Sequence, residues 1–109
     1  MNIKVEKIND FSILKIGGKM DISNSATVES EIEKLFSSGE KNIIFNCNDL
    51  NYISSSGLRV FLLAQKKAVA DKVKIHLCNL SPEIRKIFDI SGFSTIFRIF
   101  DSQEEIFER

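Results

Sequence analysis

The sequence predicts an α/β protein, a single-domain sandwich with a mixed, mostly parallel, five-stranded sheet and about four helices. The chain has 109 residues, enough for one domain with its own core. Short apolar segments typical of strands alternate with longer segments whose apolar residues recur three or four positions apart, as in amphipathic helices. The expected order is β-β-α-β-α-β-α-β-α, and strands separated by helices pair in parallel through crossover connections.

The strands are expected at residues 3–8, 11–16, 42–47, 73–78 and 96–100. The turn pair Asn9-Asp10 joins the first two as an antiparallel hairpin, which the glycine pair at 17–18 ends. The third strand contains a continuous apolar run at 43–45, typical of a strand buried on both faces. The segment 46–56 that follows it is mostly polar and is not expected to form a strand.

The helices are expected to begin at Asn24 or Ser25, at Gly57, at Pro82 and just after residues 101–102. The third has the clearest start, because Ser81 can cap it, a proline occupies its first position and Glu83 places an acid in its first turn. The last begins with a capping box in which Asp101 or Ser102 pairs with the glutamate three residues later.

Composition excludes several classes of function. Fifteen basic and fifteen acidic residues balance to a net charge of zero, which argues against a general nucleic-acid binder. No apolar run is long enough to cross a membrane, so no membrane association is expected. Cys47 and Cys78 lack metal-ligand spacing and are expected to be buried thiols in a cytoplasmic protein without a cofactor or metal. Lys4 and Glu6 on the first strand mildly discourage edge pairing.

Candidate functional residues lie where the predicted strands end, since loops at the carboxyl ends of parallel strands gather at one edge of the sheet. Residues 54–57, Ser-Ser-Ser-Gly, stand between a buried strand and a helix. A serine there can simply cap the helix, or it can carry a phosphate that the helix N-terminus stabilises. Asp21, which precedes the first helix, can be an ordinary turn acid or a polar partner of the serines.

The sequence lacks the motifs that a catalytic serine or a phosphate-binding loop would need. A nucleophilic serine needs a base, and the only histidine, His76, is expected to be an exposed residue in the middle of a strand. The glycine that the GxSxG motif requires two positions before its serine is replaced by Ile53. Gly17, Gly18 and Lys19 do not have the spacing of a phosphate-binding loop, and Lys19 is expected to be a solvated charge. The chain is therefore not expected to be an enzyme.

Over its whole length the sequence resembles the STAS family of sulfate-transporter and anti-sigma-factor-antagonist domains, here as one domain over 1–109. Residues 18–21, Gly-Lys-Met-Asp, match the family's pattern before the first helix. Residues 49–58, Asp-Leu-Asn-Tyr-Ile-Ser-Ser-Ser-Gly-Leu, match its longer central motif, and residues 77–82 resemble its lead into the third helix. The resemblance implies that Ser55 is the phosphoacceptor, with Ser54 and Ser56 as alternatives. It also implies partner-binding roles for Asp21, Ser54, Ser56, Gly57 and Leu58.

The resemblance further implies a stand-alone bacterial anti-sigma factor antagonist that is a monomer when free. Such a protein binds an anti-sigma factor with serine kinase activity, releases the sigma factor, and is switched off when the kinase phosphorylates it; a phosphatase resets it. One departure is Ser54, where the family usually has an aspartate that would help to position the acceptor or be recognised by the kinase. This departure leaves open an alternative, a non-phosphorylated STAS scaffold or a subunit of a larger complex of the lipid-transport or stress-signalling type.

Overall fold

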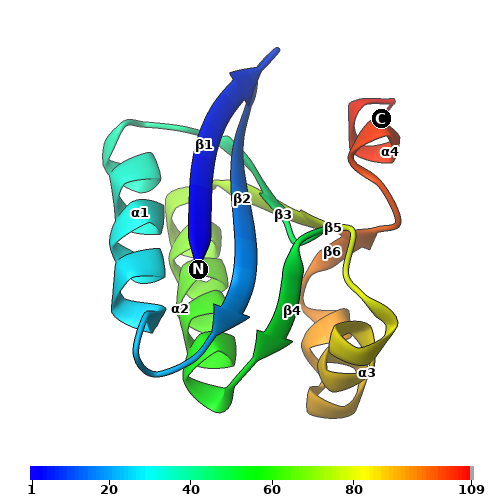
Figure 1. Ribbon diagram of the computed structural model, residues 1–109. Coiled ribbons are helices and arrows are strands. Elements are labelled where there is room, and N and C mark those ends of the chain that lie inside the picture. Colours follow the sequence, from blue (N-terminus) through cyan, green and yellow to red (C-terminus); the bar gives the residue numbers. More distant parts are fainter. Residues whose placement is uncertain (109) are drawn as a thin grey trace.

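A mixed six-stranded sheet lies at the centre of the protein (Figure 1). The computed structural model describes residues 1–108, so residue 109 of the predicted domain lies outside the described part. The strands are β1 (Asn2–Ile8), β2 (Phe11–Met20), β3 (Asn42–Asn46), β4 (Leu50–Ile53), β5 (Lys74–Cys78) and β6 (Arg98–Phe100). Their order is β1-β2-β3-β5-β6 with β4 on β2, and among the described residues only β1 is antiparallel to its neighbour. The predicted fold class is confirmed.

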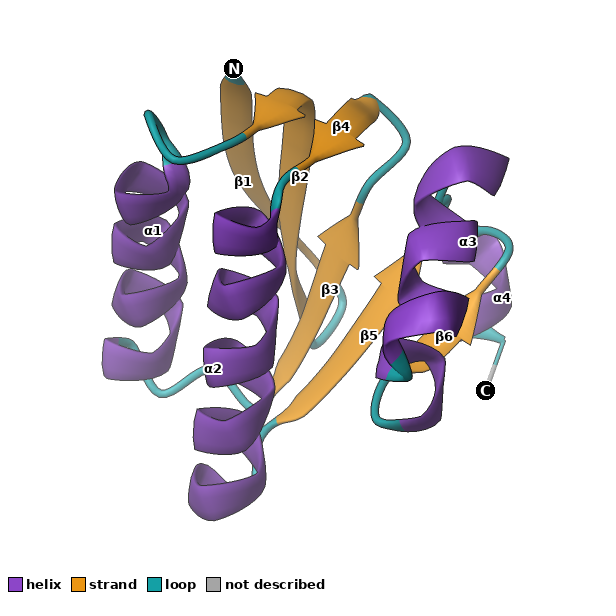
Figure 2. Ribbon diagram, turned by 90° about the horizontal axis from the view of Figure 1, so that it is seen from below, coloured by secondary structure: helices purple, strands orange, loops and turns teal. Residues whose placement is uncertain are grey.

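Three helices cover one face of the sheet and a short fourth helix lies against the other (Figure 2). They are α1 (Ser25–Ser37), α2 (Ser55–Asp71), α3 (Pro82–Ser91) and α4 (Gln103–Phe107), with a 3₁₀ turn, η1 (Phe93–Thr95), after α3. Because side chains alternate along a strand, β2 sends Leu14 to the main core under the three helices and Ile13 to the smaller cluster that Ile106 of α4 covers.

The sheet has one strand more than the sequence predicted. β4 forms inside the polar segment 46–56, where Leu50 and Ile53 are buried but the two residues between them are exposed. Neither a continuous apolar run nor an alternation marks such a strand, so its sequence gives no periodic signal. β4 forms because it can pair with the last residues of β2.

β2 is also longer than predicted and runs to Met20 instead of ending at the glycine pair 17–18. Gly18 adopts a left-handed φ of 92°, and the register of pairing shifts between Gly18 and Lys19. This irregularity lets the first part of β2 pair with β3 and its last part with β4. α2 likewise begins earlier than predicted, at Ser55.

The starts of the last two α-helices confirm the predicted serine caps. The Ser81 hydroxyl accepts a hydrogen bond from the Ile84 N–H at 3.3 Å, and the Ser102 hydroxyl accepts one from the Glu105 N–H at 3.4 Å, so Ser102 is the cap of α4. β6 begins two residues later than predicted, because η1 precedes it. Within residues 1–108, no helix has the length and apolar character needed to cross a membrane.

Candidate functional site

The ends of β2 and β4 bring two of the candidate segments together. Met20 of β2 lies opposite Ile53 of β4, and the Ser54 N–H donates to the Met20 carbonyl oxygen at 2.9 Å. Because the two strands are parallel, the chain leaves both of them at the same edge of the sheet, the lower edge in Figure 1. Asp21 and the three serines therefore share that edge.

Ser54 is the N-cap of α2. Its backbone is extended, with φ −90° and ψ 176°, and its hydroxyl oxygen accepts a hydrogen bond from the Gly57 N–H at 3.3 Å. The same hydroxyl lies 2.7 Å from the hydroxyl of Ser56, in a hydrogen bond in which either can be the donor. Both side chains are half-buried, and each already has a partner.

Ser55 differs from its two neighbours. It is the first residue of α2, and it is the exposed one of the three serines. Within residues 1–108 its hydroxyl makes no hydrogen bond, since the bonds of this segment join Ser54, Ser56 and Gly57. The arrangement presents one free hydroxyl to solvent at the start of a helix.

Gly57 lets the start of α2 lie close to the sheet. A Cβ atom added there would stand 2.7 Å from Ile53 Cγ1 and 3.0 Å from Met20 Cγ, closer than side chains pack. Gly57 is buried, and the next residue, Leu58, is half-buried and packs against the main core. Of these two predicted contact residues, only Leu58 has a side chain, part of which can reach a partner.

Asp21 lies in the turn between β2 and α1 as a half-exposed acid. One of its carboxylate oxygens, Oδ1, accepts hydrogen bonds from the Ser23 N–H at 3.0 Å and from the Ser23 hydroxyl at 2.5 Å. These bonds favour the charged form and lower the pKa of Asp21 below its usual value of 3.8. Asp21 is thus the turn acid that the sequence suggested, and its position beside the serines also suits the second role considered for it.

One exposed residue at this edge did not emerge from the sequence. Ile22, which follows Asp21, exposes 84% of its surface. It belongs neither to the apolar alternation of β2 nor to the apolar stripe of α1. Its only sequence signal is that isolation, a branched apolar residue among polar turn residues.

The start of α2 can hold negative charge. The first turn carries no acid, and the exposed Arg59 follows it. Backbone N–H groups at a helix N-terminus lack intrahelical acceptors, and the aligned peptide dipoles make this end positive. A phosphate on Ser55 would therefore lie where free donors and the helix dipole stabilise it.

The expectation of an exposed His76 is wrong. His76 exposes only 8% of its surface and lies between the rings of Phe11 and Phe100, each with its centroid 5.9 Å away. Phe107 of α4 packs against Phe11 on this same face of the sheet, away from α2. Residues far apart in the sequence therefore enclose the histidine, which a local pattern could not show.

Cys47 and Cys78 are buried free thiols, as predicted. Burial raises the pKa of Cys78 to about 12 and also raises that of Cys47, so both stay protonated near neutral pH. Among residues 1–108, no cluster of His, Cys, Asp and Glu side chains could hold a metal ion.

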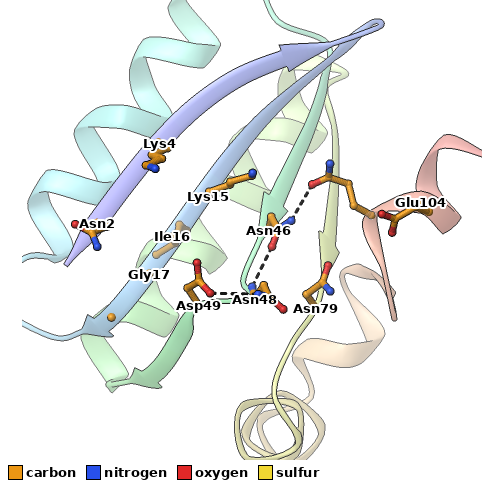
Figure 3. Close-up of a pocket in the computed structure, with 12 residues that line it drawn as sticks. Asn2, Lys4, Lys15, Ile16, Gly17, Asn46, Asn48, Asp49, Asn79 and Glu104 are labelled. Carbon is orange, nitrogen blue, oxygen red and sulfur yellow. Dashed lines mark hydrogen bonds between the residues drawn. The ribbon is translucent and has the colours of Figure 1, made fainter.

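A polar groove lies on the face of the sheet away from α1, α2 and α3 (Figure 3). In it, the Asn46 side chain donates to Gln103 Oε1 at 2.8 Å and accepts from the Asn48 N–H at 3.0 Å. Lys15, which also lines the groove, forms an ion pair with Glu6 at 2.9 Å. The two Asn46 bonds attach α4 and the loop after β3 to the sheet, and the Lys15–Glu6 pair joins β2 to β1, so we assign these side chains a structural role.

Comparisons with known proteins agree with the fold. The family model described as "STAS domain" matches residues 2–106. A Bordetella bronchiseptica protein named "Putative anti-sigma factor antagonist BtrV" is 35% identical, over 95% of this chain and 90% of its own. A crystal structure from Thermotoga maritima has a TM-score of 0.92 at 18% identity, covering 97% of this chain and 92% of that one. The Bacillus cell fate determinant SpoIIAA in its phosphorylated form has a TM-score of 0.77 at 24% identity, covering 99% and 98%.

Proposed function

The chain belongs to the STAS domain family, as a relative of anti-sigma factor antagonists, and on that premise we propose that it is a phosphorylation-switched antagonist. Its unphosphorylated form binds an anti-sigma factor with serine kinase activity and so releases a sigma factor in the cytoplasm. The kinase phosphorylates Ser55, the contact ends, and a phosphatase resets the protein. In this scheme the chain is a substrate of the kinase and not itself an enzyme.

The observation that carries the proposal is the difference among the three serines. The hydroxyls of Ser54 and Ser56 are half-buried and bonded to each other, whereas Ser55 is exposed at the first position of α2. A kinase needs a hydroxyl that it can reach, and the helix start stabilises the product. This favours Ser55 as the acceptor over its two neighbours.

The serine at position 54 is compatible with this role. Serine and aspartate are both preferred N-cap residues, because an oxygen of either can accept the N–H bond of the first helical turn. Ser54 makes that bond to Gly57, so the local start of α2 does not need an acid. What the substitution removes is a negative charge beside the acceptor.

Phosphorylation would change the contact surface through its charge. A phosphate adds about −1.5 to −2 charges near neutral pH. On Ser55 it would share its edge of the sheet with the ionised Asp21 and the apolar Ile22. A partner that buries this edge would have to desolvate the phosphate, which is strongly unfavourable unless a cation pairs with it.

The alternative is a constitutive STAS scaffold or a subunit of a larger complex. The missing acid at position 54 is the observation that favours it, since a kinase that reads this acid would not modify the chain. In that case the same edge of the sheet would bind a partner whose affinity ignores Ser55.

The test is phosphosite mapping by mass spectrometry, after incubation with ATP and the candidate kinase from the same genome. We expect one phosphate on Ser55, absent in Ser55→Ala and present in the matched control Ser56→Ala. Phosphate on Ser54 or Ser56 would contradict the assignment of the acceptor. Binding to the kinase without any phosphate would favour the scaffold.

A further inference from the structure

Ile22 has the largest exposed fraction among the large apolar residues of the described chain, at 84%. Single exposed apolar side chains are common on soluble proteins, so this exposure alone decides nothing. Ile90 on α3 is nearly as exposed, at 78%, and belongs to a different part of the surface. What distinguishes Ile22 is how its turn is held and where it lies.

The turn that carries Ile22 is braced by side chains on both sides. Asp21 Oδ1 accepts two hydrogen bonds from Ser23, and Asn24 Oδ1 accepts one from the Asp21 N–H at 3.0 Å. The Asn24 amide also donates to the Lys19 carbonyl oxygen at 2.7 Å, which ties the turn back to β2. The backbone N–H of Ser25 adds a bond to the Asp21 carbonyl oxygen at 2.9 Å. Ile22 is thus held at the tip of a turn whose backbone is already ordered.

The position of Ile22 connects it to the serine edge. Asp21 directly follows the residue that pairs with Ile53, and Ser55 begins α2 two residues after Ile53. A protein contact of ordinary size covers about 800 Å² on each partner, so a contact centred on this edge of the sheet is large enough to cover both turns. An apolar side chain on an already ordered backbone costs less conformational entropy on binding than one on a flexible loop.

We propose that Ile22 is the apolar anchor by which this protein holds its anti-sigma factor, inserted into an apolar pocket of that partner. The inference rests on the function proposed above and adds a second residue to it. Ser55 controls the contact, and Ile22 supplies much of its affinity. A phosphate on Ser55 keeps its hydration shell. The partner therefore cannot exclude water from the contact around Ile22, as such an anchor requires.

The test compares two isoleucines. Affinity for the candidate kinase is measured by calorimetry for the wild type, Ile22→Ala and Ile90→Ala, all unphosphorylated. We expect Ile22→Ala to weaken binding about 10- to 100-fold, as for an anchor residue, and Ile90→Ala to change it less than about twofold. Both side chains are exposed, so both variants should keep the wild-type unfolding temperature, which is measured in parallel.

A second arm tests the link to Ser55. In the Ser55→Asp background, the charge already prevents the partner from excluding water around Ile22. In that background Ile22→Ala should weaken the remaining binding by less than about threefold. Equal affinities of Ile22→Ala and the wild type, with Ser55→Asp still weakened, would overturn the anchor and leave the proposed function standing. A wild type that does not bind the kinase at all would overturn both.

Discussion

Two turns follow strands β2 and β4 at the same edge of the sheet. In one, the side chain at the N-cap position bonds to the helix that follows, and in the other it bonds to the residues that precede it. In the β4–α2 turn, Ser54 points forward along the chain and caps the helix that follows, through the Gly57 N–H. In the β2–α1 turn, Asn24 occupies the N-cap position of α1, but its side chain makes no hydrogen bond to that helix. Its amide points backward instead, to the Asp21 N–H and the Lys19 carbonyl oxygen.

The difference explains what each turn presents to solvent. The forward cap, which is the bond from the Gly57 N–H to the Ser54 hydroxyl, satisfies a donor at the start of α2. It leaves the next hydroxyl, that of Ser55, exposed at the helix end where an anion is stabilised. The backward brace, which is the pair of bonds from the Asn24 side chain to Asp21 and Lys19, fixes the tip of its turn and leaves Ile22 exposed on an ordered backbone. One turn is therefore suited to carry a charge and the other to carry an apolar contact.

The largest effect should come from breaking the close packing of the β4–α2 turn. In Gly57→Ala the new methyl group would stand 2.7 Å from Ile53 Cγ1, so helix or strand must move, and we expect a loss of about 1–3 kcal/mol in the free energy of unfolding. Urea denaturation measures this. The control is Gly39→Asn, because Gly39 has open space around it and asparagine tolerates its φ of 78°. Equal losses in the two variants would contradict the packing argument.

A smaller effect should follow from removing the forward cap. Ser54→Ala loses the acceptor for the Gly57 N–H, and we expect the free energy of unfolding to fall by about 1 kcal/mol. Ser54→Asp keeps a capping oxygen and should stay within about 0.5 kcal/mol of the wild type. If Ser54→Asp were as unstable as Ser54→Ala, serine at this position would not be serving as the cap of α2.

Loosening the backward brace should affect local order more than global stability. Asn24→Ala removes two hydrogen bonds of a partly exposed turn, and we expect a loss of about 0.5–1 kcal/mol in the free energy of unfolding. The Ser23 amide, which donates to Asp21, should exchange faster with deuterium in this variant. Unchanged exchange at Ser23 would show that the turn holds its shape without Asn24.

The sequence predicted the elements whose signals are local. Ser81 and Ser102 cap their helices as the spacing of serine, proline and glutamate indicated. β4 was missed because its stability comes from pairing with the end of β2 rather than from a pattern of its own. That pairing in turn depends on the left-handed backbone of Gly18, which the sequence suggested as the end of a strand.

For the candidate site, the prediction of which residues lie together came from the topology of the sheet. Parallel strands end at one edge of a sheet, and that rule predicts that Asp21 and the serines lie together. The rule places residues but does not tell which side chain is exposed, so it could not separate Ser55 from Ser54 or Ser56. It also gave no reason to notice Ile22, whose importance depends on hydrogen bonds made by its neighbours.

The smallest effect concerns the charge in the braced turn. Bonds from Ser23 lower the pKa of Asp21 below 3.8, so the ionised form contributes stability above that pH, and the contribution is lost as the pH falls through the lowered pKa. Ser23→Ala removes the hydroxyl donor but keeps the N–H donor, so the pKa of Asp21 should rise part of the way towards 3.8. NMR titration of the Asp21 carboxyl carbon measures this, with Ser30→Ala on the exposed side of α1 as the control. A pKa that does not move in Ser23→Ala would mean that the hydroxyl bond does not hold the charge, and that the turn owes its order to Asn24 and the backbone.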